Sequence, residues 1–296
     1  MRFKDVSILF LVNPAAGNGK AKRDWPEISK MIGEHFTDYD IKFTERPMHA
    51  TELTREAIRD GVETVVSCGG DGTLNEVING AAESNVKVGL IPLGTGSDFG
   101  KTIGIRTPED SIKALGENRT VKMDIGRVTF NESGEKRFFI NVLEIGFGAE
   151  VMSYVNSHAK HGNRTFVRGI FSTIWKLKKF RPGAENDLLK DVETTEAIVA
   201  NGRYFGGGML ASPGSQVSDG LLDVHILKPV SRITTILRLR TLVNGSYIEK
   251  GYSYDDKVKS IRFGEAGNLV EMDGEVVGRT PIDISLVQQG CNFIVP

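Results

Sequence analysis

The chain of 296 residues lacks several features that mark specialised protein classes. Its two cysteines, Cys68 and Cys291, are too few for a disulfide framework or a cysteine metal site, so a reducing cytoplasm is the expected location. No run of about 18 consecutive apolar residues occurs, and no membrane-spanning helix is expected. The apolar run at residues 6–12 leads directly into Asn13-Pro14. It is typical of a first strand and not of a signal peptide, which needs a longer apolar core and a cleavage site.

An excess of one charge is also missing. The formal net charge is -1 at pH 7, which argues against a general nucleic-acid-binding surface. Hydrophobic residues make up 40% and charged residues 25% of the chain, as is ordinary for a globular protein. The length allows one large domain or two of ordinary size.

Three well-known site signatures are absent as well. Lys20 is followed by Ala21, so the first glycine-rich loop is not a Walker A motif. None of the glycine-rich loops reads G-x-G-x-x-G, which excludes a dinucleotide-binding fingerprint. The G-x-S-x-G elbow of a serine hydrolase does not occur either.

The most informative stretch is residues 65–82, VVSCGGDGTLNEVINGAA. It predicts the end of a buried strand, a glycine turn and a helix with one apolar stripe. Thr73 and Glu76 have the spacing of a capping box, and the free N–H groups of such a helix start attract anions. Asp71 among the glycines makes sense beside phosphate if it holds Mg²⁺. A plain strand-to-helix turn is the alternative interpretation.

Two further glycine-rich turns follow predicted strands, at residues 13–21 (NPAAGNGKA) and 92–102 (PLGTGSDFGKT). Strands alternate with helices in this half of the chain, which predicts a parallel sheet with right-handed crossovers. The expected strands are residues 6–12, 40–44, 63–67 and 86–92, and the expected helices are residues 21–36 and 50–60. Because loops after parallel strands share one edge of the sheet, the three turns are expected to meet in one ligand-binding crevice.

Beyond residue 124 the pattern changes to alternating apolar and polar residues separated by turns, which predicts an antiparallel, β-rich second domain. The expected strands are residues 138–143, 196–200, 221–227, 258–263, 268–272 and 281–287. We therefore predict an α/β domain over residues 1–124 and a β-rich domain over residues 125–296. The last strand is a candidate to return to the first domain.

One segment, residues 157–181, interrupts the β pattern. It combines lysines and arginines with aromatic and aliphatic residues and contains no acidic residue, as is typical of an amphipathic helix on an anionic membrane surface. A solvated basic face above a packed apolar face is the alternative. His158 and His161 lie within the segment without a nearby third ligand, and we expect them to be surface residues.

Taken together, the motifs resemble the diacylglycerol kinase catalytic family, the lipid kinases that include sphingosine kinases and bacterial diacylglycerol kinase-like proteins. The resemblance runs almost end to end. It rests on Asn13-Pro14 with Gly17 and Gly19, Gly69-Gly70-Asp71-Gly72-Thr73 with Asn75-Glu76, Pro92-Leu93-Gly94-Thr95-Gly96 with Asp98, Asn201-Gly202 with Gly206-Gly207-Gly208, Asp219-Gly220 with Leu222-Asp223, and Asp273-Gly274-Glu275.

The resemblance implies an α/β plus β fold and an active site between the two domains. The first domain would be a parallel-sheet nucleotide domain like those of NAD kinases and phosphofructokinases, and the second an antiparallel β-sandwich that handles the lipid. It also implies contacts with ATP from Asn13, Pro14, Ala15, Ala16, Gly17, Thr44, Gly69, Gly70, Asp71, Gly72, Thr73, Leu74, Asn75 and Thr95.

The resemblance assigns chemistry to a few residues. Asp71 would organise the catalytic Mg²⁺ through water, and Glu275 matches the general base. A structural Mg²⁺ would be bound by Gln216, Asp219 and Leu221, the first and last through their backbone carbonyls. From the residues alone, Glu275 could equally be a polar strand residue after the hairpin turn at Asp273-Gly274.

Two departures from the family pattern affect these assignments. Ser97 stands where the family usually has Asn in G-T-G-N-D, which bears on nucleotide affinity or lipid placement. Residues 212–215 (SPGS) replace the commoner A-P-x-A, which bears on the structural metal site.

The expected function is an ATP- and Mg²⁺-dependent kinase that phosphorylates a lipid hydroxyl, with diacylglycerol first among the acceptors, in phospholipid metabolism. The expected partners are a lipid substrate and the anionic inner face of the membrane, and no nucleic acid is expected. A homodimer is expected only because it is the commonest assembly of soluble proteins. The alternatives are an NAD kinase-like enzyme that acts on a soluble hydroxyl and a non-catalytic nucleotide or lipid sensor. The presence of both Asp71 and Glu275 argues against a sensor.

Overall fold

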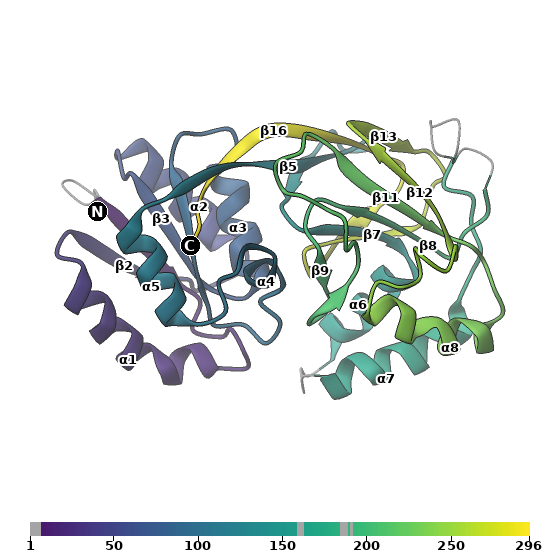
Figure 1. Ribbon diagram of the computed structural model, residues 1–296, viewed down its shortest axis with the longest axis horizontal. Coiled ribbons are helices and arrows are strands. Elements are labelled where there is room, and N and C mark those ends of the chain that lie inside the picture. Colours follow the sequence, from purple (N-terminus) through teal and green to yellow (C-terminus); the bar gives the residue numbers. More distant parts are fainter. Residues whose placement is uncertain (1–6, 159–162, 184–188, 190–191) are drawn as a thin grey trace. The chain divides into compact units, whose positions relative to one another are not determined.

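The computed structural model describes residues 7–158, 163–183, 189 and 192–296, and its contacts divide the chain into two compact units (Figure 1). Unit 1 comprises the chain up to residue 125 together with residues 287–296, and unit 2 comprises residues 126–286. Two long strands, β5 (Thr120–Phe130) and β16 (Ile282–Ile294), each have one end in either unit. Each unit has a hydrophobic core of its own.

Unit 1 is built on a parallel sheet in the order β2-β1-β3-β4, with the C-terminal end of β16 added in parallel beside β4. The strands are β1 (Ile8–Val12), β2 (Tyr39–Phe43), β3 (Thr64–Gly69) and β4 (Lys87–Pro92). Every residue of β3 is buried, as expected of a parallel strand that is covered on both faces.

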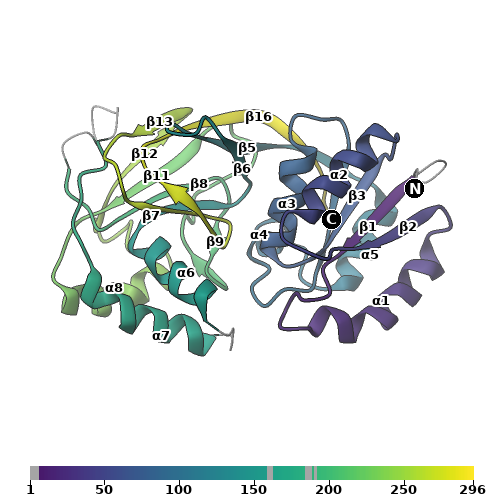
Figure 2. The same ribbon diagram turned by 180° about the vertical axis from the view of Figure 1, so that it is seen from behind.

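Helices cover both faces of this sheet (Figures 1 and 2). The amphipathic helix α1 (Lys20–His35) shares a core cluster with α5 (Pro108–Glu117), whereas α2 (His49–Arg59) packs against α3 (Asp71–Ala81). A short helix, α4 (Asp98–Ile103), follows the third glycine turn. The predicted parallel-sheet α/β architecture of this half of the chain is confirmed.

The capping box predicted for α3 is wrong. The helix begins at Asp71 after Gly70, and no side chain caps it. Glu76 accepts a hydrogen bond from the Ala50 N–H at 2.9 Å, so its carboxylate serves a neighbouring helix. A complete capping box forms instead at α5, between Thr107 and Asp110. The sequence has the T-x-x-E spacing of a capping box, but the Glu76 carboxylate accepts a hydrogen bond from α2 and not from the start of its own helix.

Unit 2 contains a six-stranded antiparallel sheet in the order β12-β11-β8-β7-β14-β15. Its strands are β7 (Val142–Gly146), β8 (Glu196–Ala200), β11 (Leu222–Leu227), β12 (Ser253–Val258), β14 (Leu269–Met272) and β15 (Glu275–Arg279). The second layer pairs β6 (Lys136–Phe139) with β5 and β13 (Ser260–Phe263) with β16, and a small hairpin joins β9 (Tyr204–Phe205) to β10 (Met209–Leu210). One core cluster lies between the two layers, which confirms the predicted antiparallel β-sandwich.

Helices α6 (Phe147–Ser157), α7 (Asn163–Thr173) and α8 (Arg232–Val243) also belong to unit 2, with a 3₁₀ turn, η1 (Ile174–Lys176), directly after α7. The single basic helix predicted over residues 157–181 is therefore wrong as one element. Its residues 159–162, including His161, lie outside the described part of the chain. His158 is exposed and stacks on Tyr154. Among the described residues, no helix is both long and apolar enough to cross a membrane.

Candidate functional site

Three glycine-rich turns follow β1, β3 and β4 and are joined by backbone contacts. The N–H groups of Leu93 and Gly94 donate to the Gly69 carbonyl at 2.8 and 3.1 Å. A Cβ on Gly94 would lie 2.5 Å from the Gly70 Cα, and a Cβ on Gly17 would lie 2.6 Å from the Leu93 carbonyl oxygen. Only glycine allows this approach, so the three turns lie against one another as their position after parallel strands predicts.

Asn13 connects the first turn to the second. Its side-chain amide donates to the Thr73 hydroxyl at 3.0 Å, while its amide oxygen accepts from the Ala15 N–H. Its own N–H donates to the Cys68 carbonyl. Asn13 thereby holds the small-residue loop against the first turn of α3, the end of a helix that attracts anions.

Asp71 connects the second turn to the third. Its carboxylate lies in the first turn of α3 and accepts from the Phe99 N–H, at the start of α4, at 3.2 Å. Next to Phe99, Asp98 is buried and pairs with Lys101 at 2.9 Å. Sequence reasoning singled out Asp98 but not its partner, because Lys101 shows no distinctive signal in the chain.

The other predicted nucleotide contacts divide into backbone and side-chain candidates. The Leu74 side chain is in the core and the Thr73 side chain is buried, so both can offer a ligand only their backbone. Asn75 accepts from the Asn79 amide, and the Thr44 N–H donates to the Val12 carbonyl beside the first turn. The Thr95 side chain is exposed. Pro14, Ala16, Gly70 and Gly72 are half-buried, and Ala15 is exposed.

In unit 2, the turn at Asp273-Gly274-Glu275 joins β14 to β15 and is held by acidic side chains. Asp273 is buried, and its two carboxylate oxygens accept the N–H groups of Ile140, Asn141 and Val142, each at 3.0 Å. Glu275, the first residue of β15, is exposed. The turn therefore exposes the Glu275 carboxylate, while hydrogen bonds to Asp273 hold its backbone in place.

A second motif of unit 2 lies against the same segment. The N–H groups of Asn201 and Gly202 donate to the Asn141 carbonyl at 2.9 and 2.8 Å, and the Asn201 amide donates to the Ile140 carbonyl. A Cβ on Gly202 would overlap the Asn141 side chain. Residues 140–142 are therefore held by hydrogen bonds with two motifs, Asn201-Gly202 and the Asp273 turn.

Sequence reasoning missed three buried glutamates behind this turn. Glu144 on β7 is directly opposite Glu271 on β14, and Glu196 on β8 is opposite Gly146 on β7. Glu271 accepts the Gly274 N–H, and Glu196 accepts the Gly148 N–H at the start of α6. One alternating strand pattern cannot reveal that three acids share a buried face.

Burial raises the pKa of all three carboxyl groups well above the ordinary value. Repulsion adds to this effect, from Glu196 on Glu144, from Glu144 on Glu271, and from Glu271 on Glu196. The N–H groups of Gly148 and Phe147 oppose it at Glu196. The three carboxyl groups are therefore not all ionised, because neighbouring buried carboxylates repel one another.

The residues predicted to bind a structural Mg²⁺ lie beside a lysine side chain. Asp219 accepts the Leu221 N–H with one oxygen and the Lys257 ammonium, at 3.1 Å, with the other. The same ammonium lies 3.2 Å from Asp223, and Gln216 is exposed. In the described residues, no group of three His, Cys, Asp or Glu side chains is arranged to hold a metal ion. Lys257 already supplies the positive charge at this position.

A Ser-His-Asp hydrogen-bond chain occurs in unit 2 although no hydrolase motif predicts it. His225 bonds to the Ser212 hydroxyl at 2.8 Å and to the Asp255 carboxylate at 2.7 Å. Burial acts to raise the pKa of Asp255, but hydrogen bonds from His225 and Ser253 leave it lowered. Ser212 exposes only 1% of its surface, so a carbonyl substrate has no access to its hydroxyl. The chain of bonds fixes the segment after β10.

Comparison with known proteins gives matches over both units. A model of the diacylglycerol kinase catalytic domain matches residues 7–128, and a model of the YegS C-terminal NAD kinase beta sandwich-like domain matches residues 141–295. A protein named diacylglycerol kinase from Mycobacterium tuberculosis is 28% identical and aligns over 97% of this chain and 94% of its own length. A YegS-like lipid kinase of Klebsiella pneumoniae is 31% identical over 71% of each chain. A crystal structure from Bacillus anthracis is 26% identical, with a TM-score of 0.79 over 98% of this chain and 95% of that one.

Proposed function

The chain belongs to the diacylglycerol kinase family of lipid kinases, and we propose that it transfers the γ-phosphoryl group of ATP to a lipid hydroxyl, with diacylglycerol as the leading acceptor. The observation that carries this proposal is the contact of three glycine turns around Asp71 at one edge of the parallel sheet. Two relatives that align over nearly the whole chain are named diacylglycerol kinase.

Unit 1 supplies the groups that would bind ATP. Glycines at 17, 70 and 94 let the three turns approach one another, so that their backbone N–H groups would surround phosphate, and the N-terminus of α3 adds a favourable dipole. Asn13 and Thr73 would keep this cradle rigid, and Thr44 and Thr95 are candidates for further nucleotide contacts. Such preorganised donors stabilise charge that develops on the transferred group.

Asp71 fits a magnesium ion that is bound mainly by nucleotide phosphates. Mg²⁺ in kinases needs only one or two protein carboxylates in addition to phosphate and water oxygens. The half-buried Asp71 carboxylate in the first turn of α3 meets that requirement. When bound, the ion would neutralise charge on the phosphates. The Asp71 hydrogen bond with the Phe99 N–H would hold the carboxylate in orientation.

Unit 2 supplies the carboxylate that would act as general base. The Glu275 carboxylate would accept the proton of the lipid hydroxyl while the hydroxyl oxygen bonds to the γ-phosphorus and the bond to the leaving ADP oxygen breaks. Glu275 is exposed, whereas Asp273 and Glu271 are buried and hold the turn. Of the three acids, Glu275 is therefore the one that a substrate can reach.

The protein would act in phospholipid metabolism at the inner face of the membrane, where its lipid substrate would be found. The basic residues of the segment that contains α7 would provide attraction to anionic lipids.

The test is transfer of labelled γ-phosphate from ATP, with Mg²⁺, into a total lipid extract. We expect one labelled lipid with the unaltered protein and a roughly 10²- to 10⁴-fold slower reaction with Glu275→Gln, at unchanged ATP affinity. Asp71→Ala should also abolish labelling. Glu249→Gln, at an exposed glutamate elsewhere in unit 2, is the matched control and should label at the normal rate.

Two results would refute the proposal. Labelling by Glu275→Gln at the rate of the unaltered protein would show that this carboxylate is not the base. Tight ATP binding without any labelled lipid would favour a soluble acceptor or a sensor.

A further inference from the structure

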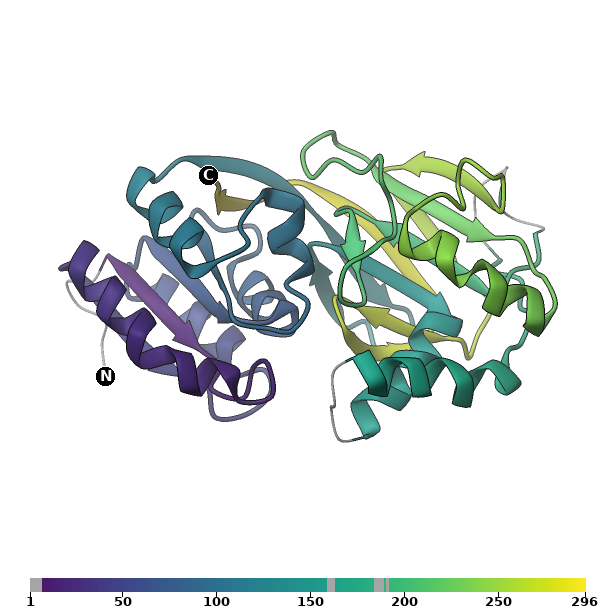
Figure 3. The same ribbon diagram turned by 60° about the horizontal axis from the view of Figure 1, so that its bottom comes forward.

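Helix α7 and η1 expose large apolar side chains, and Figure 3 shows α7 along one edge of unit 2. Val167 and Phe171 are four residues apart in α7, which places them on a common side of that helix, and Trp175 follows in η1. Their exposed fractions are 48%, 57% and 72%. Isolated apolar residues on a surface are ordinary, but a continuous row of this kind marks an interaction site.

Helix α8 extends this apolar surface. None of its twelve residues is buried, and Ile233 and Leu237, one turn apart, are 74% and 73% exposed. The helix is nevertheless well anchored, because Ser231 caps its N-terminus and Arg238 lies over the Tyr252 ring at 3.7 Å. Only Leu242 near its end packs against a small core cluster, so the outward face of this firmly held helix is available for a partner.

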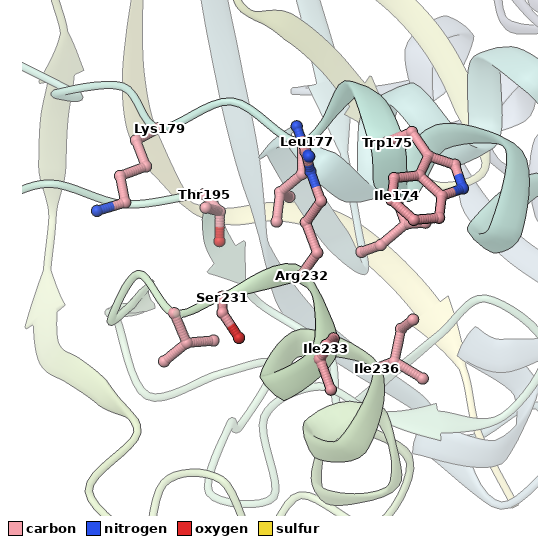
Figure 4. A pocket seen from close by; sticks show the side chains of 10 residues that line it. Ile174, Trp175, Leu177, Lys179, Thr195, Ser231, Arg232, Ile233 and Ile236 are labelled. Carbon is pink, nitrogen blue, oxygen red and sulfur yellow. The ribbon is translucent and has the colours of Figure 1, made fainter.

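A groove of about 450 Å³ joins the two elements. Figure 4 shows Ile174 and Trp175 across from Ile233 and Ile236. The Arg232 guanidinium lies 5.8 Å from the centre of the Trp175 ring, so it links α8 to η1. The groove and the exposed rows therefore form one surface, which we call the α7–α8 surface.

The two segments that form this surface carry only positive charges, although Lys179 pairs at 3.7 Å with Glu193 from a neighbouring segment. Residues 163–183 contain six lysines and arginines, residues 228–243 contain four, and neither segment contains an acidic residue. Cations flanking exposed tryptophan and aliphatic side chains complement an anionic lipid bilayer. A second copy of the chain docked face to face would bring positive charge against positive charge, which disfavours it.

We propose that the α7–α8 surface docks on an anionic lipid bilayer, with Trp175, Ile233 and Leu237 inserted at the level of the headgroups. This inference rests on the proposed function, because a lipid kinase must reach a hydroxyl that resides in a bilayer. It adds α8, whose role no motif indicates, to the basic segment that contains α7.

Tryptophan fluorescence tests the docking directly, because the chain has only two tryptophans. Trp25 is buried in the core of unit 1, so Trp25→Phe leaves Trp175 as the only reporter. We expect its emission to shift to shorter wavelength on addition of vesicles of phosphatidylcholine mixed with phosphatidylglycerol, and to shift back at high salt. Unchanged emission with these anionic vesicles would overturn the proposal.

Paired variants distinguish docking through this surface from nonspecific binding to vesicles. Ile233→Ser with Leu237→Ser should lower vesicle affinity at least about tenfold, whereas Phe43→Ser, at an exposed phenylalanine of unit 1, should not. Lys176→Gln with Lys178→Gln should lower vesicle affinity by roughly fivefold per cation, with the exposed Lys113→Gln as control. Vesicle binding by the α8 variant equal to that of the parent would contradict the proposal. A dimeric parent with a monomeric α8 variant in sedimentation would instead identify a dimer interface.

A soluble assay keeps this test independent of the proposed function. On a short-chain, water-dispersed diacylglycerol, the α8 variant should react as fast as the parent, and it should be slow only on bilayer substrate. If the parent binds anionic vesicles and phosphorylates neither substrate, the proposed function fails and the docking surface stands. If the parent phosphorylates both substrates but does not bind the vesicles, the docking surface fails alone.

Discussion

The glycine turns of unit 1 and the Asp273-Gly274-Glu275 turn of unit 2 position their functional groups by different means. In unit 1 the turns touch through backbone atoms, and the essential property of Gly17, Gly70 and Gly94 is the absence of a side chain. In unit 2 the turn is held by carboxylates that are themselves buried. The first arrangement is sensitive to added volume, and the second is sensitive to lost hydrogen bonds and to protonation.

Asp273→Asn is expected to have the largest effect of the substitutions that test this comparison. An amide has one acceptor oxygen, so it cannot accept from Ile140, Asn141 and Val142 as the two carboxylate oxygens do. Hydrogen bonds to a charged group contribute about 1.5–3 kcal/mol each, so we expect a loss of roughly 2–5 kcal/mol in unfolding free energy. Urea denaturation measures it. Glu275→Gln, two residues away but exposed, should unfold like the parent, and equal stability of both variants would contradict this account.

Gly94→Ala tests the backbone contacts of unit 1. The new Cβ would lie 2.5 Å from the Gly70 Cα, and the adjustment should cost about 1–3 kcal/mol. If the turns move apart, ATP affinity should fall roughly ten- to hundredfold, as measured by calorimetry.

Gly116→Ala is the matched control for Gly94→Ala. Gly116 lies in α5, and a Cβ there meets no atom within 4 Å. This substitution should stabilise the protein by about 0.5–1 kcal/mol without affecting ATP. An ATP affinity that is equal in both variants would refute the role of close backbone approach.

The buried glutamates give unit 2 a pH dependence that the glycine turns lack. Because the pKa of Glu144 is raised above the ordinary 4.5, the folded state binds a proton more tightly than the unfolded state. The unfolding free energy should therefore fall as pH rises above about 4.5, with a slope of at most about 1.4 kcal/mol per pH unit for each such proton. In Glu144→Gln this slope should be smaller in urea denaturation at a series of pH values. The exposed Glu249→Gln should keep the parent slope, and a parent slope in both would contradict the prediction.

The smallest expected effect concerns the cation at Asp219 and Asp223. Since Lys257 already pairs with both, removal of divalent cations by a chelator should leave the melting temperature unchanged. Lys257 is partly exposed, so Lys257→Met should cost only about 1 kcal/mol, and its melting temperature should then rise with added Mg²⁺. Lys259→Met, two residues further on and also exposed, should neither lower the stability nor make the melting temperature depend on Mg²⁺. A lower melting temperature of the parent protein in chelator would contradict this prediction and support the metal site that the resemblance implies.

Much of unit 1 could be predicted because its pattern is local. A buried strand, a glycine turn and an amphipathic helix follow one another within residues 65–82, and the observed β3 and α3 agree with that reading. The absence of a capping box at Thr73 and Glu76 could not be predicted, because Glu76 bonds to Ala50 of another helix.

Unit 2 was less predictable because its key partners are distant in the chain. Glu144 and Glu271 lie 127 residues apart, and only the pairing of β7 with β14 places them opposite each other. Ser212, His225 and Asp255 come from three different segments. Helix α8 was missed because its apolar residues face several sides and give no stripe.

The sequence by itself determined the α/β plus β fold, the glycine turns and the family, because periodicity, turn chemistry and motif spacing are properties of neighbouring residues. Only the tertiary structure decided which carboxylates are buried, which cation lies beside Asp219, and which apolar side chains remain exposed on α8. Those properties depend on what packs against each side chain, and the residues that pack there are brought together by strand pairing and not by their order in the chain.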